Sequence, residues 1–375
     1  MSGAPVGRGA GFDPPTRFQR TTLEPFDVEP CPDADDPSPP RTQFFVDRTK
    51  SVLARNDSPD VPFRWSINPY RGCEHGCIYC YARPSHEYLG FSAGVEFETK
   101  ILVKPDAPEI LAETLASPNW TGEYVCVSGN TDCYQPAERT LKLTRRCLEV
   151  FREFGNPIGV ITKNALVARD ADVLAAMAEK DLAEVTITVT TLDPELARKL
   201  EPRASTPSRR LAAVRALADA GVPVNVNVAP VVPGLTDDEI PALLAAAKAH
   251  GARTVGWTML RLPLAVEPLF LDWLKREVPL KERKVLARLR DLRGGKLTEA
   301  GWGVRMRGRG PYAELIRALF ETTCRRLGFA ERPRDLDAPE ARAADARAKR
   351  AREARATPRR RPLPPTPEET QGSLF

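Results

Sequence analysis

A chain of 375 residues with 42% hydrophobic residues is long enough to bury one large domain with flanking segments. Its eight cysteines are irregularly spaced, unlike the disulfide framework of a small secreted protein, and no apolar run approaches the roughly 20 residues that span a bilayer. The first residues lack an apolar core of signal-peptide length, and a net charge of +5 does not by itself indicate a nucleic-acid partner. We therefore expect a cytoplasmic protein.

The chain begins with a segment of low hydrophobic periodicity. Residues 1–43 are rich in proline, glycine and aspartate, so we predict a mostly disordered leader there. The folded core is expected over residues 44–295, after a turn-rich approach that ends near Phe63.

A loop with three clustered cysteines opens the predicted core. Cys73, Cys77 and Cys80 have the spacing Cys-x3-Cys-x2-Cys, and Tyr79 stands directly before the third. Three thiolates can bind three irons of a [4Fe-4S] cube and leave the fourth iron open to a non-protein ligand. Two glycines inside the loop permit the tight backbone turns that such a cube requires. The loop therefore predicts an iron-sulfur centre with an open coordination position.

Two other interpretations of this loop remain. Zinc prefers four closed ligands, and His75 and His86 are the nearby candidates for a fourth ligand. The three cysteines could also be unrelated thiols in a core. The spacing and the two glycines favour the iron-sulfur cluster over both.

Beyond the loop, short β-branched runs alternate with segments of helical periodicity. Alternation of this kind predicts a parallel sheet with crossover helices, and six such units predict a partial β/α barrel. The expected strands are 65–68, 124–127, 158–162, 185–190, 222–228 and 254–259. The expected helices are 137–154, 170–179, 207–220 and 237–250.

Polar residues follow several of these strands at their carboxyl ends, where barrels of this kind place their working residues. A glycine-containing loop at 128–138 follows the second strand, and Lys163 ends the third. Thr188 is the candidate for a barrel-lining hydroxyl on the fourth, and Arg203 comes later in a Glu-Pro-Arg stretch, where it could contact a carboxylate or a phosphate. Plainer interpretations are a capped turn, solvated charges and the preference of threonine for strands.

The last part of the chain carries a cap and a basic tail. Residues 296–330 include an amphipathic segment at 311–327, which we expect to form a helix that covers the barrel. Residues 331–375 are dominated by proline, arginine and alanine, so we predict disorder. Such a tail either releases counterions from a DNA backbone or is a solvated arm without a partner.

The chain ends in a short apolar peptide. Gln371, Leu374 and Phe375 resemble the bacterial sliding-clamp-binding peptide, in which two apolar side chains fill a pocket and the glutamine makes a hydrogen bond. The alternative is a terminus without a partner. Clamp binding would place the protein at DNA.

The cysteine loop resembles the signature of the radical S-adenosylmethionine superfamily. This resemblance implies a radical SAM barrel of the partial (β/α)6 type, a [4Fe-4S] cluster held by Cys73, Cys77 and Cys80, and S-adenosyl-L-methionine bound at the open iron. It also implies an external electron donor of ferredoxin or flavodoxin type and reductive cleavage of the cofactor to a 5′-deoxyadenosyl radical. The resemblance assigns Tyr79 to the cofactor position by position, and together with the strand-end residues the predicted cofactor-binding set is Tyr79, Gly129, Asn130, Asp132, Glu138, Lys163, Thr188 and Arg203.

A larger set of motifs is similar to the bacterial group called spore-photoproduct-lyase-like or DNA repair photolyase-related. The motifs are Asn-Pro-Tyr-Arg-Gly before the first cysteine, then Asn-Thr-Asp, Thr-Lys-Asn and Glu-Pro-Arg, spread over residues 44–330. Spore photoproduct lyase uses a cysteine as hydrogen donor near the Asn-Thr-Asp position, where this chain has Gly129 and Asn130. Cys133 or Cys126 is the substitute donor that we expect, with Tyr134 as a second catalytic candidate.

The resemblance implies a lyase-type enzyme that acts on DNA lesions. An enzyme with the same radical chemistry on RNA, a peptide or a small metabolite is the first alternative. The second is a non-catalytic iron-sulfur or zinc protein that serves as an interaction module.

Overall fold

The structure, a computed structural model, describes residues 7–18, 24–27 and 40–329. The basic tail and the terminal peptide predicted at 331–375 lie outside the described residues. Within the described part, no helix is both long enough and apolar enough to cross a membrane.

Six parallel strands make up most of the main sheet, and each overlaps one of the predicted strands. Their order is β3, β6, β7, β8, β9, β10, and the antiparallel strand β2 extends the β3 edge. Because β2 and β10 end the sheet on its two sides, the arrangement is the predicted partial barrel. The bounds are β2 (Leu53–Arg55), β3 (Trp65–Ile67), β6 (Val125–Val127), β7 (Ile158–Thr162), β8 (Ala183–Thr188), β9 (Val224–Val231) and β10 (Thr254–Met259).

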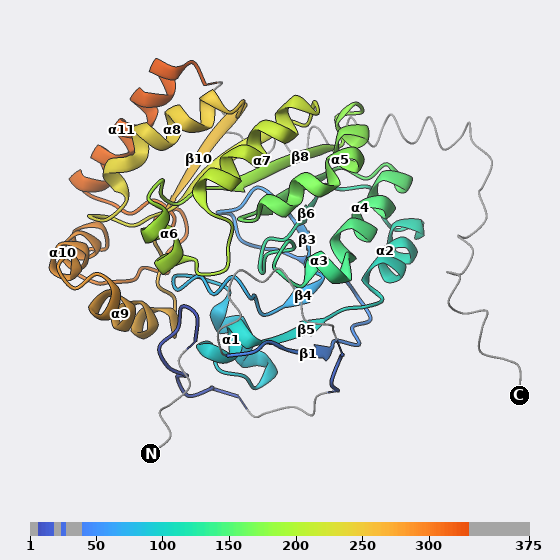
Figure 1. Cartoon of the computed structure of the whole chain (residues 1–375), viewed down its shortest axis with the longest axis horizontal. Coiled ribbons are helices and arrows are strands. Elements are labelled where there is room, and N and C mark those ends of the chain that lie inside the picture. The colour runs from blue at the N-terminus through green and yellow to red at the C-terminus, as the bar shows by residue number, and fades with distance from the viewer. Residues whose placement is uncertain (1–6, 19–23, 28–39, 330–375) are drawn as a thin grey trace, which may run out of the picture.

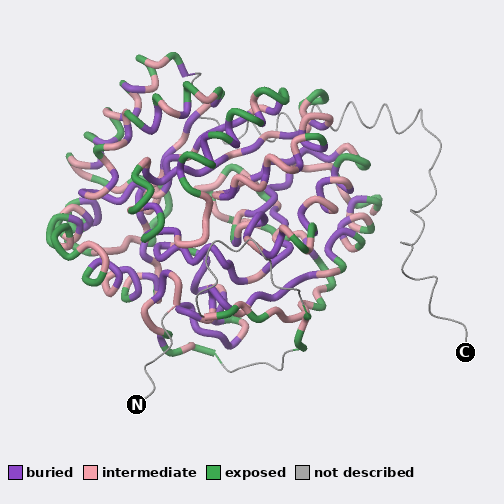
Figure 2. The backbone as a smooth tube through the Cα atoms, viewed as in Figure 1, coloured by how far each residue is buried: buried purple, intermediate pink, exposed green. Residues whose placement is uncertain are grey.

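Crossover helices cover the outside of this sheet (Figure 1). Their buried residues recur at helical spacing, as Leu243, Leu244 and Ala247 do in α8, and they form one hydrophobic core with the outward faces of the strands. In Figure 2 the strands and the sides of the helices that face them are mostly buried, and the outer sides of the helices are exposed. The bounds are α2 (Ala107–Ala116), α4 (Leu143–Phe154), η2 (Ala165–Asp170), α5 (Ala171–Ala178), α7 (Pro207–Asp219), η3 (Asp237–Glu239) and α8 (Ile240–Ala249).

The helix predicted at 137–154 is broken into two. A short α3 (Glu138–Leu141) precedes α4, and Lys142 between them has the left-handed φ of 52°. The Glu138 carboxylate accepts a hydrogen bond from the backbone N–H of Thr144 at 2.9 Å, so it caps the start of α4. Hydrophobic periodicity does not predict this break, because it depends on the backbone conformation of Lys142 and not on the apolar pattern.

Strand alternation divides the sheet into an apolar outer face and a polar inner face. In β8, Val185 and Ile187 belong to the hydrophobic core, whereas Thr186 and Thr188 line the interior of the barrel. The threonines of this strand therefore share one face, as predicted. Asn227 of β9 extends the polar lining.

A second, small sheet lies below the barrel in Figure 1 and carries the cysteine loop. It has the order β1-β5-β4, and the cysteines follow directly after β4. The bounds are β1 (Gln43–Val46), β4 (Tyr70–Arg71), η1 (Arg83–Leu89), α1 (Val95–Thr99) and β5 (Lys100–Val103). Three further helices lie towards the other side of the loop, α6 (Pro194–Leu200), α9 (Val266–Glu277) and α10 (Glu282–Leu292).

Residues 7–18, in the segment for which composition predicts disorder, contact the core instead. The backbone N–H groups of Arg8, Gly9 and Ala10 all donate to the Glu98 carboxylate, at 2.7, 3.1 and 2.8 Å. Ala10 is fully buried. A carboxylate some 90 positions away supplies the acceptors, and local composition cannot reveal that.

The strands β10 and β2 end the main sheet and do not pair with each other, and we call the gap between them the seam. Residues of other segments link its two sides. Residues 302–307 attach to β10, since the Met259 N–H donates to the Met306 carbonyl at 2.9 Å. Across the seam, Arg305 pairs with Asp60 and donates to Ser58 Oγ at 2.6 Å. The seam is thus closed by contacts of a few residues.

The predicted C-terminal cap is confirmed as a helix, α11 (Pro311–Leu327). It packs on α8 through a stripe that includes Ala313, Ile316 and Phe320, and the Phe320 ring lies 6.0 Å from the Trp257 ring, centroid to centroid. Leu315 of the same helix is 59% exposed.

Truncation of the stripe should destabilise the whole domain. We expect Phe320→Ala to lower the free energy of unfolding by about 3 kcal/mol, because it removes a buried ring and leaves a cavity. The matched variant Leu315→Ala, on the exposed face, should change it by less than about 0.5 kcal/mol. Urea denaturation measures both, and equal effects of the two variants would show that α11 does not dock through this face.

Candidate functional site

The cysteine loop turns sharply at two glycines. Gly72 and Gly76 have φ values of +78° and +66°, which L-residues with side chains rarely adopt. The loop is tied to α1 through the N–H of Cys73, which donates to the carbonyl of Phe97 at 2.9 Å. These turns place Cys73, Cys77 and the later Cys80 on the wall of one cavity.

The buried ion pair of Arg83 and Glu98 fixes the conformation of this loop. The Arg83 guanidinium donates to the carbonyls of Gly76 and Cys77 at 3.1 and 3.0 Å, and to Glu98 at 2.6 Å. Both charged side chains are fully buried. The same guanidinium also donates to two carbonyls at the start of α1, so one side chain fixes the loop against the helix that follows it.

The N-terminal segment packs directly on the loop. Glu98, which pairs with Arg83, accepts the N–H groups of residues 8–10. Gly9 lies so close that a Cβ atom on it would stand 2.0 Å from the carbonyl oxygen of Gly76. The residue at position 9 must therefore lack a side chain.

The end of α6 supports the loop on another side. The N–H of Ile78 donates to the carbonyl of Leu200 at 3.0 Å, and the Tyr79 hydroxyl donates to the buried Glu201 carboxylate. Glu201 also accepts from Thr190 at 2.6 Å and pairs with Arg210. Burial and the charge of Glu201 raise the pKa of the Tyr79 hydroxyl, so it stays protonated as a donor.

Arg203 continues this support. Its guanidinium donates to Glu74 at 2.8 Å and its backbone N–H donates to the carbonyl of His75 at 3.2 Å. The Glu-Pro-Arg stretch thus positions the loop, and Arg203 is not among the residues that line the cavity. The charge of Arg203 is paired with Glu74, and its predicted cofactor contact stays a prediction.

The three thiols suit an iron-sulfur cluster. Burial raises the pKa of each, and Lys163 acts in the opposite direction on Cys77 and Cys80. Thiols that resist ionisation in an empty site become thiolates when a bound metal supplies positive charge. Three of them on one cavity wall match a cluster with one iron left for a ligand.

The two histidines considered as a fourth zinc ligand each contact other side chains. His75 faces Asp132 and Asn164, at 3.4 and 3.3 Å. His86 stacks on Phe91 with ring centroids 5.0 Å apart.

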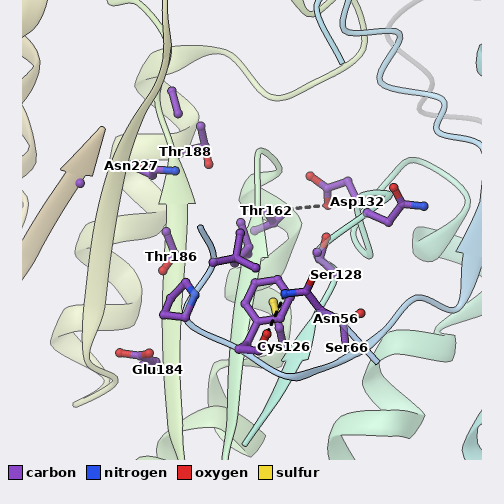
Figure 3. Close-up of a pocket in the computed structure, with 18 of the residues that line it drawn as sticks. Asn56, Ser66, Cys126, Ser128, Asp132, Thr162, Glu184, Thr186, Thr188 and Asn227 are labelled. Atoms are coloured by element: carbon purple, nitrogen blue, oxygen red, sulfur yellow. Dashed lines mark hydrogen bonds between the residues drawn. The ribbon is translucent and has the colours of Figure 1, made fainter. Parts of the chain in front are cut away.

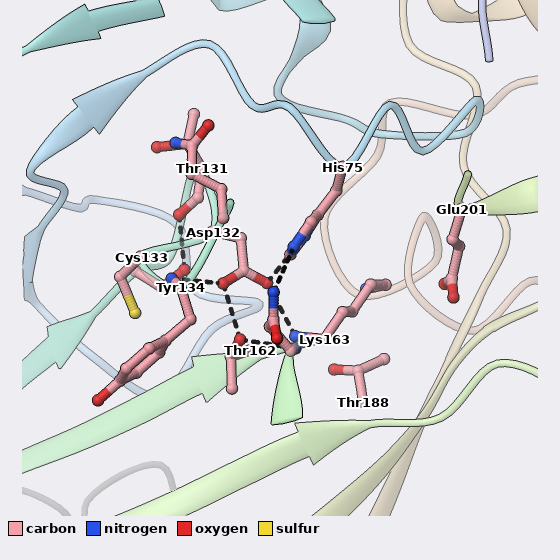
Figure 4. Close-up of polar contacts among 12 residues, drawn as sticks. His75, Thr131, Asp132, Cys133, Tyr134, Thr162, Lys163, Thr188 and Glu201 are labelled. Atoms are coloured by element: carbon pink, nitrogen blue, oxygen red, sulfur yellow. Dashed lines mark hydrogen bonds and ion pairs between the residues drawn. The ribbon is translucent and has the colours of Figure 1, made fainter. Parts of the chain in front are cut away.

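Asp132, which follows β6, contacts Thr162 and Lys163 at the end of β7 (Figure 4). Its carboxylate accepts from the Thr162 hydroxyl at 2.7 Å and from the Lys163 N–H at 2.8 Å, and it faces His75. Burial would raise the pKa of Asp132, but the charge and hydrogen bond of His75 and the donors from Lys163 and Thr162 lower it to about 2. Asp132 is therefore ionised at neutral pH.

The cavity fills the barrel and has a volume of about 1790 Å³. Figure 3 shows Ser66, Cys126, Glu184, Thr186 and Thr188 around it, each on the inner face of its strand. Its lining includes the three thiols and, from the seam, Asp60, Arg261 and Arg305; these three seam residues define what we call the cavity mouth.

Most of the predicted cofactor positions meet in this cavity. The ones that line it are Tyr79, Gly129, Asn130, Asp132, Lys163 and Thr188. The Lys163 Nζ atom lies 5.8 Å from the centroid of the Tyr79 ring. The two residues come from different elements, the cysteine loop and the end of β7, so the fold brings together what the sequence separates.

Three other predicted residues lie away from the cavity. Cys133 and Tyr134 are fully buried in the core, and the Tyr134 hydroxyl donates to Asp170 at 3.0 Å. Glu138 is also fully buried and accepts from Tyr70 and Arg169. These side chains stabilise the packing behind the loop, and the catalytic roles predicted for Cys133 and Tyr134 and the cofactor contact predicted for Glu138 stay predictions.

Of the two predicted hydrogen donors, Cys126 lines the cavity, and it lies in the middle of β6. Its neighbours Val125 and Val127 point into the core, so alternation directs Cys126 inwards. That alternation was readable in the sequence. The supports Arg83, Glu98 and Glu201 were not, because each acts through partners far along the chain or through backbone carbonyls.

Comparisons with known proteins agree with this geometry. A family model described as "Radical SAM superfamily" matches residues 67–247. An uncharacterized protein of Mycobacterium tuberculosis is 38% identical over 237 residues, which cover 62% of this chain and 68% of that protein. An uncharacterized protein of Methanocaldococcus jannaschii is 27% identical over 176 residues, 47% of this chain and 63% of that one.

Solved structures of spore photoproduct lyase share the fold. The enzyme complexed with dinucleoside spore photoproduct has a TM-score of 0.53 and 16% identity, covering 76% of this chain and 78% of that one. A double mutant with bound AdoMet and dinucleoside spore photoproduct has a TM-score of 0.56 and 17% identity, covering 76% and 79%.

Removal of one partner of the buried pair should destabilise the loop and the N-terminal segment together. We expect Glu98→Gln to lower the free energy of unfolding of the cluster-free protein by about 3 kcal/mol, because Arg83 then lacks a buried counter-charge. Limited proteolysis should also cut residues 7–18 faster. Glu109→Gln, which removes an exposed partner of Arg146, is the control and should leave both readouts unchanged. If the Glu98→Gln variant were as stable as the wild type, this role of the ion pair would be contradicted.

The Asp132 carboxylate should contribute stability in a defined pH range. Its folded-state pKa of about 2 is below the ordinary value, so the contribution is complete above about pH 4 and is lost as pH falls towards 2. Asp132→Asn should therefore cost about 2 kcal/mol at pH 7, and the difference from wild type should shrink between pH 4 and pH 2.5. Urea denaturation of cluster-free protein measures this, and a difference independent of pH would refute it.

Proposed function

The chain belongs to the radical S-adenosylmethionine superfamily, whose enzymes use a [4Fe-4S] cluster, S-adenosyl-L-methionine and an electron donor, and we propose that this one acts on damaged bases in DNA. The observation that carries the proposal is that the three thiols line the same cavity as a polar barrel interior with cationic residues at its mouth. A cavity of about 1790 Å³ can hold a cofactor of this size together with a nucleotide.

The [4Fe-4S] cluster and S-adenosylmethionine, when bound, would supply a 5′-deoxyadenosyl radical that abstracts hydrogen from a substrate. Cys73, Cys77 and Cys80 would hold the cluster. Lys163, beside the Tyr79 ring, places a positive charge in the cavity for the carboxylate of S-adenosylmethionine.

The residues around this charge keep it in place. The backbone of Lys163 is fixed because its N–H donates to Asp132, which itself is held by Thr162. Tyr79 is fixed because its hydroxyl donates to Glu201. Gly129, with a φ of +88°, lets the loop after β6 approach a ligand without a side chain in the way. Thr188 offers a hydroxyl from the neighbouring strand β8.

Three features support DNA as the substrate. The fold is shared with spore photoproduct lyase, which binds dinucleoside spore photoproduct in its solved complexes. Arginines line the cavity mouth. Arginine is also frequent in the last 45 residues, and its positive charges favour binding to the phosphates of a DNA backbone.

A lyase-type repair reaction needs a hydrogen donor, and Cys126 is the cysteine in the cavity that remains for this role once the cluster ligands are set aside. We assign the donor position to Cys126 rather than to the buried Cys133. A cytoplasmic location and a ferredoxin or flavodoxin donor fit an oxygen-sensitive cluster. Clamp binding through Gln371, Leu374 and Phe375 stays a prediction from the sequence.

The test begins with anaerobic reconstitution of the cluster and reduction by dithionite in the presence of S-adenosylmethionine. We expect wild type to form 5′-deoxyadenosine and methionine, and ultraviolet-irradiated DNA to increase their yield over undamaged DNA. Cys77→Ala should abolish cleavage. Cys147→Ala changes a buried cysteine on the outer side of the barrel and is the matched control that should keep it.

Two outcomes would redirect the proposal. If cofactor cleavage occurs but damaged DNA never increases it, the substrate is RNA, a peptide or a small metabolite. If a reduced cluster forms and S-adenosylmethionine stays intact with every substrate offered, the enzyme assignment itself fails for this chain.

A further inference from the structure

Arg261 is a cation at the cavity mouth that pairs with no carboxylate. It follows β10 by two residues and lines the cavity. Its Nη1 atom lies 3.5 Å from the thioether sulfur of Met306, a weak acceptor, and within the described residues no carboxylate oxygen comes within salt-bridge distance of it. A guanidinium has five N–H donors, and the one side-chain contact to Met306 occupies only one of them.

The neighbouring arginines differ in this respect. Arg293 is buried and donates to three backbone carbonyls, at 2.9, 3.0 and 3.0 Å. Arg305 is engaged with Asp60 and Ser58 across the seam, and Arg307 donates to a carbonyl of β10 at 2.7 Å. Structural roles explain these three, and none explains Arg261.

The surroundings of Arg261 penalise its charge. Burial, and then the positive charge of Arg305, lower the pKa of its guanidinium, and the smaller opposing effects of Tyr81 and Asp60 do not offset them. A cation under such a penalty is stabilised by an anion that enters the cavity mouth, because the anion offsets both desolvation and repulsion. The site therefore favours an anionic ligand.

Beside this cation lies an aromatic face. Tyr81 lines the cavity and is 52% exposed, and its hydroxyl donates to the carbonyl of Gly129, which fixes the ring. Trp302 of the seam is 56% exposed, with the guanidinium carbon of Arg305 3.8 Å from its ring centroid. Arginine beside exposed, rigid rings is the combination that binds single-stranded nucleic acid, by phosphate contact and base stacking.

We propose that Arg261 binds a backbone phosphate of a DNA strand at the cavity mouth, and that the Tyr81 ring stacks against a base next to that phosphate. The inference rests on the proposed function and deepens it. A strand that directs one base into the barrel must leave a flanking phosphate and a flanking base at the mouth, and these two residues meet them.

The test measures binding of a fluorescein-labelled eight-nucleotide oligothymidylate to the reconstituted holoenzyme by fluorescence anisotropy, without oxygen and over 50–200 mM salt. We expect Arg261→Gln to weaken binding about tenfold and to reduce the slope of log K against log salt by about one. Arg253→Gln removes the same charge at the opposite end of β10, where Arg253 lines the same cavity, and should change neither quantity.

The aromatic part is tested with a matched pair. Tyr81→Leu should weaken binding about tenfold with an unchanged salt slope, because a stacking face is lost without a charge. Tyr81→Phe removes the bond to Gly129 but keeps the ring, and should bind within about twofold of wild type. Equal weakening by the two variants would overturn the stacking role.

The outcomes separate this inference from the proposed function. If wild type binds the oligonucleotide and Arg261→Gln binds equally well, or if Arg253→Gln is weakened as much, the phosphate role of Arg261 is wrong while the proposed function stands. Loss of S-adenosylmethionine binding in Arg261→Gln with unchanged oligonucleotide binding would also overturn it, because the anion is then the carboxylate of the cofactor. Absence of oligonucleotide binding by wild type overturns this inference, whereas the proposed function is decided by the cofactor-cleavage test with damaged DNA.

Discussion

The buried pair of Arg83 and Glu98 is the contact on which the arrangement of the site depends. Arg83 reaches the carbonyls of the cysteine loop, and Glu98 reaches the N–H groups of residues 8–10. A buried ion pair often adds little net stability, but it tolerates few alternative geometries, because each unpaired group would be costly. Two charges thus fix the mutual positions of a loop, a helix start and a distant N-terminal segment.

The two faces of one sheet carry out separate tasks. Valine and isoleucine on the outer face pack against the crossover helices, while threonine, asparagine, serine and cysteine on the inner face line the cavity. Because alternate residues of a strand point to opposite faces, the same strands provide stability and a reactive interior. Polar groups on the inner face have one another as partners, as Glu184 has Tyr124 and Asn225, at 3.1 and 3.0 Å.

The sequence predicts those parts of the molecule that depend on short-range pattern. All six parallel strands, the cap helix and the cysteine loop follow from spacing and periodicity. The predicted site residues that lie outside the cavity share one feature: their final positions depend on contacts that are distant in the sequence. Cys133 and Glu138 stand in a conspicuous motif, but a turn after β6 sends them into the core, and Arg203 meets Glu74 across 129 positions of the chain. Proximity to a motif does not determine the face on which a side chain lies, and long-range ion pairs leave no local pattern.

The seam between β2 and β10 has a mechanical consequence. Strands within the sheet are joined by ladders of backbone hydrogen bonds that break together, whereas the seam is joined by Arg305, Asp60, Ser58 and a few backbone contacts of residues 302–307. Each such contact is worth about 1 kcal/mol, or somewhat more where charge assists. The circumference of the barrel is therefore its softest dimension: the wall can widen along one line while every strand pair and the cysteine loop remain intact.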